Sequence, residues 1–314
     1  MRTFLVTGGA GFIGSHLCEA LLARGDRVRV LDDLSTGKRA NVPPRAELIV
    51  GDVADAASVR DAIAGTDGCF HLAAVASVEK GNRDWLGTHR TNLTGAIAVF
   101  DAARTASAAA ARPGSVPVPV VYASSAAVYG DPATVPIDES APVRPLSAYG
   151  ADKLGCELHA RVGAVVHGVP SVGMRFFNVY GPRQDPASPY SGVISIFCDR
   201  IKARQPIRIF GDGRQTRDFV YVGDVVRALV AAMERRPAEP SVFNVCTGRE
   251  TSVLDLARTV GELCGVAPEI EWCPPRSGEI RTSLGSPSAM NRHLGVVAET
   301  PLPDGLRATL AALS

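Results

Sequence analysis

Short apolar runs and longer stretches of helical periodicity alternate through the first two thirds of the chain. Short runs rich in Val, Ile, Thr and Phe are typical of strands, and apolar residues at i, i+3 and i+4 are typical of amphipathic helices. The pattern predicts strands at residues 3–7, 27–32, 47–51, 68–72, 118–124 and 171–176. It predicts helices at residues 13–24, 57–64, 93–110 and 149–167. Strands and helices that alternate in this way form βαβ units, so we expect a parallel sheet with helices on both faces.

The local composition of the chain changes after residue 176, where Pro, Gly, Arg and aromatic residues cluster. Further helices are predicted at residues 193–203, 222–235, 253–264 and 306–313. We therefore expect an α/β protein with a Rossmann-type, doubly wound parallel sheet and a smaller α/β lobe after it. The predicted domains are residues 1–176 and 177–314, with some exchange of chain between the two lobes.

The charge balance narrows the possible partners. The chain has 33 Lys and Arg against 32 Asp and Glu, a formal net charge of +1. A surface so balanced does not suit nucleic acid or an anionic membrane. The apolar runs are far shorter than the roughly 20 residues of a membrane span, and the first residues show no secretory signal pattern. We expect a cytoplasmic protein.

The 7 cysteines and 6 histidines show no metal-ligand spacing. The cysteines are odd in number and scattered, without a C-x-x-C pair. Reduced thiols are therefore expected rather than a disulfide framework, and no metal site is predicted.

A glycine-rich turn follows the first predicted strand. Gly8, Gly11 and Gly14 have the spacing G-x-x-G-x-x-G and lead directly into the first predicted helix. Such glycines allow a tight turn, close approach of the backbone to a pyrophosphate, and close packing of helix on strand. A generic glycine turn would have the same spacing, but the position at the start of a βαβ unit favours a dinucleotide site.

Two aspartates support that interpretation. Asp32 ends the second predicted strand, about 20 residues after the turn, where a carboxylate accepts hydrogen bonds from the adenosine ribose and repels a 2′-phosphate. This favours NAD over NADP. Asp52 ends the third strand and could reach the adenine amino group, although it could equally be a simple turn residue.

A serine and a Tyr-x-x-x-Lys pair supply candidate chemistry. Ser125 ends a predicted strand, and Tyr149 and Lys153 share one face of the following helix. A free phenol has a pKa near 10 and is a poor base at neutral pH, and a neighbouring ammonium favours its phenolate form. Such a tyrosine can take a proton from a sugar hydroxyl and return it, while the serine hydrogen-bonds the same hydroxyl. The pair can arise by chance, but only 4 of the 33 basic residues are lysines.

The motifs together resemble one family. VTGGAGFIGSHL, LDDLSTG, GDVAD, HLAA, ASSAAVYG, SAYGADK, RFFNVYGPRQ, GDGRQTRDFVYVGDV and PPRSGEIRTS occur in the order found in extended short-chain dehydrogenases/reductases of the nucleotide-sugar epimerase/dehydratase group. Within that group the chain is most similar to the 4-epimerases of UDP-glucose and UDP-N-acetylglucosamine. The resemblance covers nearly the whole chain. It implies an NAD-binding Rossmann domain, a UDP-sugar-binding lobe and a homodimer.

The resemblance also implies site residues. The catalytic set would be Ser125, Tyr149 and Lys153. The NAD site would include Gly8, Gly11, Phe12, Ile13, Gly14, Asp32, Asp33, Ser35, Thr36, Gly37, Asp52, Val53, Leu72, Ala73, Ala74, Asn92, Ser124, Tyr149, Lys153 and Phe177. The UDP-sugar would contact Ser125, Asn178, Val193, Arg217, Arg276 and Ser283.

Departures from the family pattern narrow the activity. Family dehydratases carry Asp-Glu after the catalytic Ser or Thr, and decarboxylases carry a Glu there, but this chain has Ala126 and Ala127. Asp185 follows GPRQ, where enzymes acting on a glucuronate tend to have a basic residue. These differences favour 4-epimerisation of a neutral UDP-hexose by transient oxidation at C4 and hydride return. Another NAD-dependent nucleotide-sugar oxidoreduction and a non-catalytic NAD sensor are the alternatives.

Two finer expectations follow from the resemblance. Ser283 stands where some galactose-type epimerases have a bulky Tyr, so a small residue would leave room for an N-acetyl group, unless Ser283 is only a small loop residue. The stretch RQDPASPYSGVI also resembles the N-acetylhexosamine-type enzymes. The helices at residues 93–110 and 149–167 are candidates for a dimeric four-helix bundle, although their alanines would also suit packing on the sheet.

Overall fold

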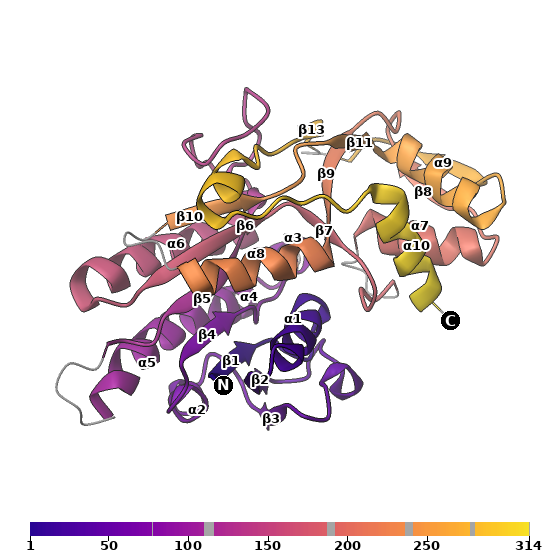
Figure 1. Cartoon of the computed structure of the whole chain (residues 1–314). Coiled ribbons are helices and arrows are strands. Elements are labelled where there is room, and N and C mark those ends of the chain that lie inside the picture. The colour runs from indigo at the N-terminus through magenta and orange to yellow at the C-terminus, as the bar shows by residue number, and fades with distance from the viewer. Residues whose placement is uncertain (77, 110–115, 187–191, 236–240, 277–279, 314) are drawn as a thin grey trace. The chain divides into compact units, whose positions relative to one another are not determined.

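The computed structural model describes residues 1–314 except 77, 110–115, 187–191, 236–240, 277–279 and 314 (Figure 1). The chain forms two compact units. The first contains Met1–Gly130, Val143–Arg175 and Val226–Phe243, and the second contains Asp131–Pro142, Phe176–Val225 and Asn244–Ser314. The assignment of cofactor binding to residues 1–176 and of substrate binding to 177–314 stays a prediction.

A seven-stranded sheet forms the centre of the first unit, and it confirms the predicted Rossmann-type architecture. Its order is β10-β6-β5-β4-β1-β2-β3, and the pairs β1–β2, β1–β4, β2–β3 and β4–β5 are parallel. The strands are β1 (Thr3–Thr7), β2 (Arg27–Asp32), β3 (Glu47–Val50), β4 (Gly68–His71), β5 (Val120–Ser125), β6 (Ser171–Phe176) and β10 (Ser241–Val245). The first six lie within two residues of the predicted strands, and β10 was not predicted.

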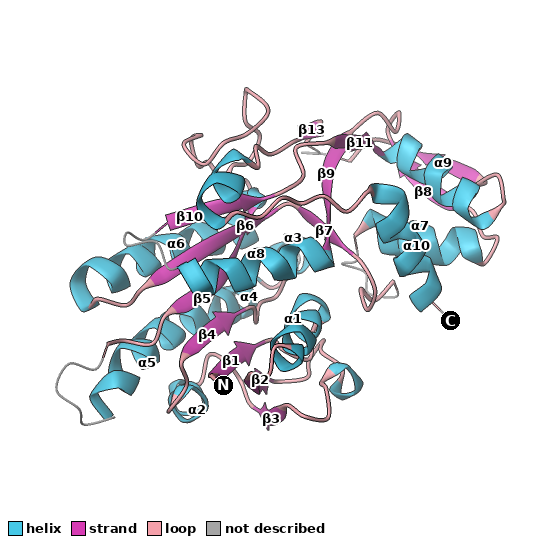
Figure 2. Ribbon diagram, viewed as in Figure 1, coloured by secondary structure: helices cyan, strands magenta, loops and turns pink. Residues whose placement is uncertain are grey.

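Helices cover both faces of this sheet (Figure 2). They are α1 (Phe12–Ala23), α2 (Ala56–Ile63), α3 (Val78–Arg83), α4 (Trp85–His89), α5 (Gly95–Ala109), α6 (Ala148–His167) and α8 (Val222–Arg235). On one face, α2, α5 and α6 pack on residues of β1, β2, β4 and β5 in a single apolar core. On the other face, α1 and α8 lie against the sheet, with Gly68 close to the Met233 side chain.

The helix predicted at 93–110 is confirmed as α5, which begins two residues later than predicted. It is preceded by α3, α4 and a π-helical turn at Arg90–Thr94, and α5 itself begins at Gly95. The preceding segment is rich in charged residues and contains Gly81 and Gly87, so it carries no apolar period that would have predicted two short helices. Residue 110 lies outside the described residues.

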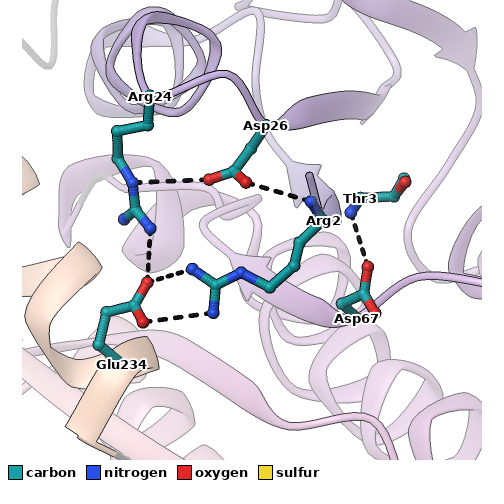
Figure 3. Close-up of polar contacts among 6 residues, drawn as sticks. All are labelled: Arg2, Thr3, Arg24, Asp26, Asp67 and Glu234. Carbon is teal, nitrogen blue, oxygen red and sulfur yellow. Dashed lines mark hydrogen bonds and ion pairs between the residues drawn. The ribbon is translucent and has the colours of Figure 1, made fainter.

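Charged side chains connect α8 to the first strand and to the end of α1 (Figure 3). The Glu234 carboxylate accepts hydrogen bonds from both terminal nitrogens of Arg2 and from Arg24 Nη2, the latter at 2.6 Å. Arg24 Nε also lies 3.5 Å from the carboxylate of Asp26, which accepts from the Arg2 backbone N–H. Beside this group, Asp67 accepts from the Thr3 backbone N–H. These contacts lie at the N-terminal end of β1, away from its glycine-rich carboxyl end.

The second unit has its own sheets and core. β9 (Thr216–Tyr221) pairs with β7 (Asn178–Tyr180), β11 (Glu250–Ser252) and β13 (Thr282–Ser283), and β8 (Ile207–Phe210) pairs with β12 (Ile270–Cys273). Helices α7 (Val193–Lys202), α9 (Val253–Cys264) and α10 (Leu302–Ala312) pack together over an apolar core. The last helix begins four residues before its predicted start. The Pro at position 303 lies in its first turn, where proline is tolerated because its missing N–H has no intrahelical partner to lose.

None of the helices that the structure describes combines the length and apolarity needed to cross a bilayer. Within the same described ranges, no three His, Cys, Asp or Glu side chains gather into a cluster that could hold a metal ion.

Candidate cofactor and catalytic site

The glycine turn lies where the strand order of the large sheet reverses. β1 pairs with β2 on one side and with β4 on the other, and all three strands are parallel, so the loops that follow β1 and β4 leave the same edge of the sheet. In open α/β sheets this switch point at the carboxyl ends of the strands is the usual ligand site. The predicted residues Gly8, Gly11 and Leu72–Ala74 lie in these two loops, and the predicted Phe12, Ile13 and Gly14 form the first turn of α1.

Two of the glycines permit contacts that no other residue would allow. Gly8 has φ 72°, and a Cβ there would lie 2.7 Å from the Ala73 backbone nitrogen. A Cβ at Gly14 would overlap the Gly8 carbonyl oxygen and lie 2.8 Å from the Gly9 Cα. The turn is therefore closed tightly against the start of α1, which begins at Phe12 with Gly11 as its N-cap. Its first-turn N–H groups consequently meet no capping side chain, which suits the binding of a pyrophosphate.

The loop after β4 is held by a buried threonine. Thr7 Oγ1 lies 2.8 Å from His71 Nδ1 and accepts a hydrogen bond from the Ala73 N–H at 3.2 Å. Burial, with a smaller contribution from Lys153, lowers the pKa of His71 to about 3, so its imidazole is neutral. These contacts fix Ala73 beside Gly8. His71 is the first residue of the HLAA motif, but it was not predicted as a site residue.

Asp32 is part of the turn itself. Its Oδ2 accepts from the Ala10 N–H at 2.9 Å, and its Oδ1 accepts from the Leu34 N–H at 2.9 Å. Burial raises the pKa of Asp32, and these two backbone hydrogen bonds oppose that rise. A Cβ at Gly37 would lie 2.8 Å from Asp32 Oδ1, so a glycine at this position allows the loop to pass close to the carboxylate. Each carboxylate oxygen has a second lone pair, which leaves capacity to accept from a ribose hydroxyl.

The remaining residues of the LDDLSTG motif are mostly exposed. The Asp33 carboxylate accepts from the backbone N–H of Ser35 at 2.9 Å and from its hydroxyl at 2.6 Å. Thr36 is exposed beside them. The loop is tied back to the glycine turn by the Lys38 N–H, which donates to the Ala10 carbonyl at 3.0 Å. The motif thus forms a loop that covers Asp32 on one side.

Asp52, Val53 and Asn92 all have structural partners. Asp52 accepts from the Ala54 N–H at 2.8 Å and forms an ion pair with Arg90 at 2.8 Å. Val53 lies in the core beneath α5. The buried Asn92 side chain accepts from the Val75 N–H at 2.7 Å and donates to the Val75 carbonyl at 3.3 Å, which holds the loop after β4. Their contacts with a cofactor stay predictions.

The candidate catalytic residues come together at the end of β5. Lys153 is 3% exposed, its Nζ donates to the Ala123 carbonyl at 2.9 Å, and it lies 5.8 Å from the centre of the Tyr149 ring. Ser125, two residues after Ala123, ends the strand, and its Oγ accepts from the Ala127 N–H at 3.1 Å. Helix α6 approaches this turn closely, because a Cβ at Gly150 would lie only 2.6 Å from the Ala127 carbonyl oxygen.

A buried ionic cluster that sequence reasoning missed adjoins these residues. Glu157 receives two hydrogen bonds from Arg175, at 2.8 and 2.7 Å, and a third from the Ser124 hydroxyl at 2.5 Å. Arg175 Nη1 donates to the Tyr129 hydroxyl at 2.7 Å. Ser124 is 1% exposed, and its role as a cofactor contact stays a prediction. The available signal was the spacing of Glu157, four residues after Lys153 on the same helix.

The predicted UDP-sugar contacts other than Ser125 lie in the second unit. Strand β13 pairs with β9, and Ser283 is the register partner of Arg217. Because paired residues point to the same face of a sheet, both side chains lie on one face. Asn178 is the partner of Phe219, two residues along the same strand and therefore on the same face. Val193 opens α7 and packs against the core beneath this sheet.

Other predicted residues are placed separately within the second unit. The Arg276 guanidinium lies over the ring of Phe210, 3.9 Å from its centre. Phe177 is buried, and its N–H donates to the Val245 carbonyl at 3.2 Å. Asp185 is described, but residues 187–191 of the stretch singled out in the sequence lie outside the described residues.

Asp218 is a further residue that was not predicted from the sequence. It is fully buried and accepts from the Thr247 N–H, the Thr247 hydroxyl and the Gly248 N–H at 2.8, 2.7 and 2.9 Å. The Gly285 N–H lies 3.4 Å from the same carboxylate. Burial raises the pKa of Asp218, and the hydrogen bonds from Thr247 and Gly248 oppose the rise. The carboxylate therefore anchors the segment that follows Ser283.

Comparison with known proteins agrees with this geometry. The NAD dependent epimerase/dehydratase family matches residues 4–246. The UDP-glucose 4-epimerase of Mycolicibacterium smegmatis is 37% identical over 318 residues, covering 99% of this chain and 97% of that protein.

Two solved structures share the fold over nearly their whole length. One is a UDP-glucose 4-epimerase from Thermotoga maritima with UDP-glucose, at 35% identity, a TM-score of 0.92, and coverage of 99% of this chain and 98% of that one. The other is a UDP-N-acetylglucosamine 4-epimerase from Methanobrevibacter ruminantium in complex with UDP-N-acetylmuramic acid, at 31% identity, a TM-score of 0.91, and coverage of 99% and 97%. Together with the family match, these similarities show that the chain belongs to the NAD-dependent epimerase/dehydratase family.

Proposed function

We propose that the protein is a 4-epimerase of a UDP-hexose that works by transient oxidation at C4. The observation that carries the proposal is the grouping of Tyr149, Lys153 and the Ser125 end of β5. The relatives support it, since they include UDP-glucose and UDP-N-acetylglucosamine 4-epimerases.

The glycine turn supports tight binding of NAD. A Cβ at Gly8 or Gly14 would collide with the backbone of Ala73 or of Gly8, so these glycines keep the turn closed, and the first-turn N–H groups of α1 would receive the pyrophosphate. Asp32 would accept from the adenosine ribose. NAD, when bound, supplies a reversible hydride acceptor for C4 of the sugar.

The residues at the end of β5 would handle the proton. Tyr149 would take the proton of the C4 hydroxyl as the carbon is oxidised and return it after the 4-keto sugar has turned its other face. Lys153, fixed by the Ala123 carbonyl, would hold its positive charge beside the phenol and favour the phenolate. Ser125 would hydrogen-bond the same sugar oxygen. The cofactor would end each cycle in its starting form, so no net oxidation would occur.

The residues beside this group favour epimerisation over elimination. Dehydration needs an acid to protonate the leaving hydroxyl, whereas Ala126 and Ala127 follow Ser125 directly in a 3₁₀ turn. Asp185 would repel the carboxylate of a uronate. We propose that Asn178, Val193, Arg217 and Arg276 hold the UDP moiety, with the arginines as charge-assisted donors to the diphosphate.

Ser283 is proposed to determine the size of the accepted sugar. It is the register partner of Arg217, so a small side chain there leaves volume beside a proposed diphosphate ligand. We propose that the enzyme accepts UDP-N-acetylglucosamine as well as UDP-glucose. In Ser283→Tyr, kcat/KM for the N-acetyl sugar should fall while that for UDP-glucose is kept or improved. Unchanged discrimination between the two sugars would contradict the assignment of Ser283.

The experiment for the activity itself uses no added cofactor. The purified protein is denatured and the released NAD is measured, and the native protein is incubated with UDP-glucose and followed by NMR. The proposal expects bound NAD and appearance of UDP-galactose, with Tyr149→Phe retaining NAD but losing turnover. A net change of absorbance at 340 nm would indicate a dehydrogenase or reductase instead, and bound NAD without turnover of any UDP-hexose would indicate a sensor.

We also propose a homodimer formed through α5 and α6. Leu158, Val162, Val165 and Val166 are exposed at spacings of four, three and one along α6, and Ile97 is exposed on α5. Residues with this spacing share a helix face, and a row of exposed large apolar side chains is typical of an interface. A second copy of the chain presenting the same faces would cover them in a four-helix bundle.

A further inference from the structure

Three residues at four-residue intervals line one face of α6. Tyr149, Lys153 and Glu157 are separated by about one helical turn each, so their side chains follow one stripe. Lys153 donates to the Ala123 carbonyl, and Glu157 accepts from the Ser124 hydroxyl. The helix that carries the candidate base is therefore tied twice to consecutive residues of β5, immediately before Ser125.

The hydrogen bond between Ser124 and Glu157 is supported by a residue of strand β6. Arg175, near the end of β6, donates a hydrogen bond to each carboxylate oxygen of Glu157. The side chains of Arg175 and Glu157 are only 6% and 8% exposed. A buried ion pair is tolerable only when its geometry and remaining hydrogen bonds are satisfied, and this one is completed by Ser124 and the Tyr129 hydroxyl. The pair thus leaves Glu157 few alternative positions.

We infer that Glu157 and Arg175 are positioning residues that act through Ser124 to fix α6 against the end of β5, and so set Tyr149 and Lys153 relative to Ser125. This inference rests on the proposed function for its kinetic consequences. Its physical basis is the sensitivity of proton transfer to placement, since a misplacement of about 1 Å can lower a rate by about 100-fold.

The first test compares two buried serines that both contact α6. Ser124→Ala removes the hydrogen bond to Glu157 near the candidate site, while Ser171→Ala removes the hydrogen bond to the Ala160 carbonyl farther along the helix. We expect kcat for UDP-glucose, expressed per molecule of enzyme-bound NAD, to fall about 10- to 100-fold in Ser124→Ala, with KM unchanged. Ser171→Ala should keep the wild-type kcat. Equal kcat in both variants, or loss of NAD that accounts for the fall, would overturn the inference.

The second test separates positioning from stability. Glu157→Leu with Arg175→Met removes both buried charges, and such apolar replacements often restore stability. We expect this double variant to unfold at a temperature close to the wild type while kcat stays low, because Ser124 has lost its partner. Recovery of kcat together with stability would show that the ion pair serves the fold alone.

A third measurement does not depend on any substrate. Amide hydrogen exchange over residues 148–153, in the full chain, should be faster in Ser124→Ala than in Ser171→Ala. If the wild type turned over no UDP-sugar, the proposed function would fail, but this comparison would still decide the inference. Equal exchange in the two variants would refute it.

Discussion

Lys153 Nζ donates a hydrogen bond of 2.9 Å to the carbonyl oxygen of Ala123, two residues before the end of β5. The ammonium is buried, and it approaches the Tyr149 ring from the side of the strand. The backbone of the sheet thus determines where the positive charge of α6 lies. A point charge with three donors suits this position better than a wide planar group.

Lys153→Arg should fold and lose most activity. A guanidinium keeps the charge but cannot occupy the space of an ammonium between Tyr149 and the Ala123 carbonyl. Turnover of UDP-glucose should fall by about 100-fold or more, the usual range for disturbing general acid–base catalysis. Lys202→Arg, on exposed α7 surface, is the matched control and should keep its rate. Near-normal turnover by Lys153→Arg would overturn the role given to this lysine.

Gly14→Ala should abolish the retention of NAD. The added methyl group would overlap the Gly8 carbonyl, so the turn and the start of α1 would have to separate. The measurement is the NAD released on denaturation of the purified variant. Gly163→Ala is the control, since a Cβ there would meet nothing closer than 3.9 Å and Ala favours a helix interior by about 1 kcal/mol. It should retain NAD and gain stability; NAD in Gly14→Ala at wild-type levels would contradict the proposed turn.

The pH dependence of stability should carry a contribution from His71. Burial lowers the pKa of His71 to about 3 in the folded chain, against about 6.5 for an unfolded histidine. The unfolded state therefore binds an additional proton between these values, so stability is full above pH 6.5 and falls as the pH drops toward 3. The slope from this group approaches about 1.4 kcal/mol per pH unit.

Urea unfolding of wild type and His71→Gln between pH 7 and 5 tests this prediction. The variant should be less stable at pH 7, because Thr7 loses a partner, but its stability should fall less steeply with pH. Identical slopes in wild type and His71→Gln would show that another group is responsible.

The ion pairs of Glu234 with Arg2 and Arg24 should contribute little to the free energy of unfolding, and only in a defined pH range. The hydrogen bond from Arg2, opposed by partial burial and aided by Arg24, lowers the pKa of Glu234 to about 2. Because the folded pKa is depressed, the contribution is present above about pH 4.5 and is lost as the pH falls toward 2. The Glu234 side chain is 40% exposed, so solvent screening limits the effect to about 1 kcal/mol or less. Glu234→Gln should lower the free energy of unfolding at pH 7 by that amount, and the difference should vanish near pH 2 and shrink in high salt.

The proposed dimer predicts a change of assembly. Val162→Glu places a charge in the exposed apolar row of α6, where a partner subunit would leave it without water. Sedimentation should show a monomer for this variant and a dimer for the wild type. Trp272→Glu, an exposed aromatic on β12, should leave the assembly unchanged. A wild-type monomer at micromolar concentration would contradict the proposal.

Local patterns were sufficient to predict β1, β2 and β6, whose bounds match the predicted residues, because apolar runs between turn residues are a local signal. The glycine turn was equally visible, since its spacing is local. Glu157, Arg175 and Asp218 were not identified, because their partners lie far along the chain. Arg175 reaches Tyr129 across 46 residues, and Asp218 reaches Thr247 across 29. A single sequence carries no signal for contacts between such distant residues. Helices α3 and α4 were not predicted because they lack the apolar periodicity of an amphipathic helix.

The two hydrogen bonds that Asp32 accepts limit how the cofactor preference could be re-engineered. A common design strategy replaces this carboxylate with a smaller or basic residue so that a phosphorylated ribose can enter. Here the same carboxylate holds the Ala10 and Leu34 amides, and Gly37 packs against it. Such a substitution would release the turn that carries the pyrophosphate site along with the charge that repels the phosphate. In this chain, selectivity for the cofactor and the shape of its binding loop are encoded by one side chain, and a redesign would have to rebuild both together.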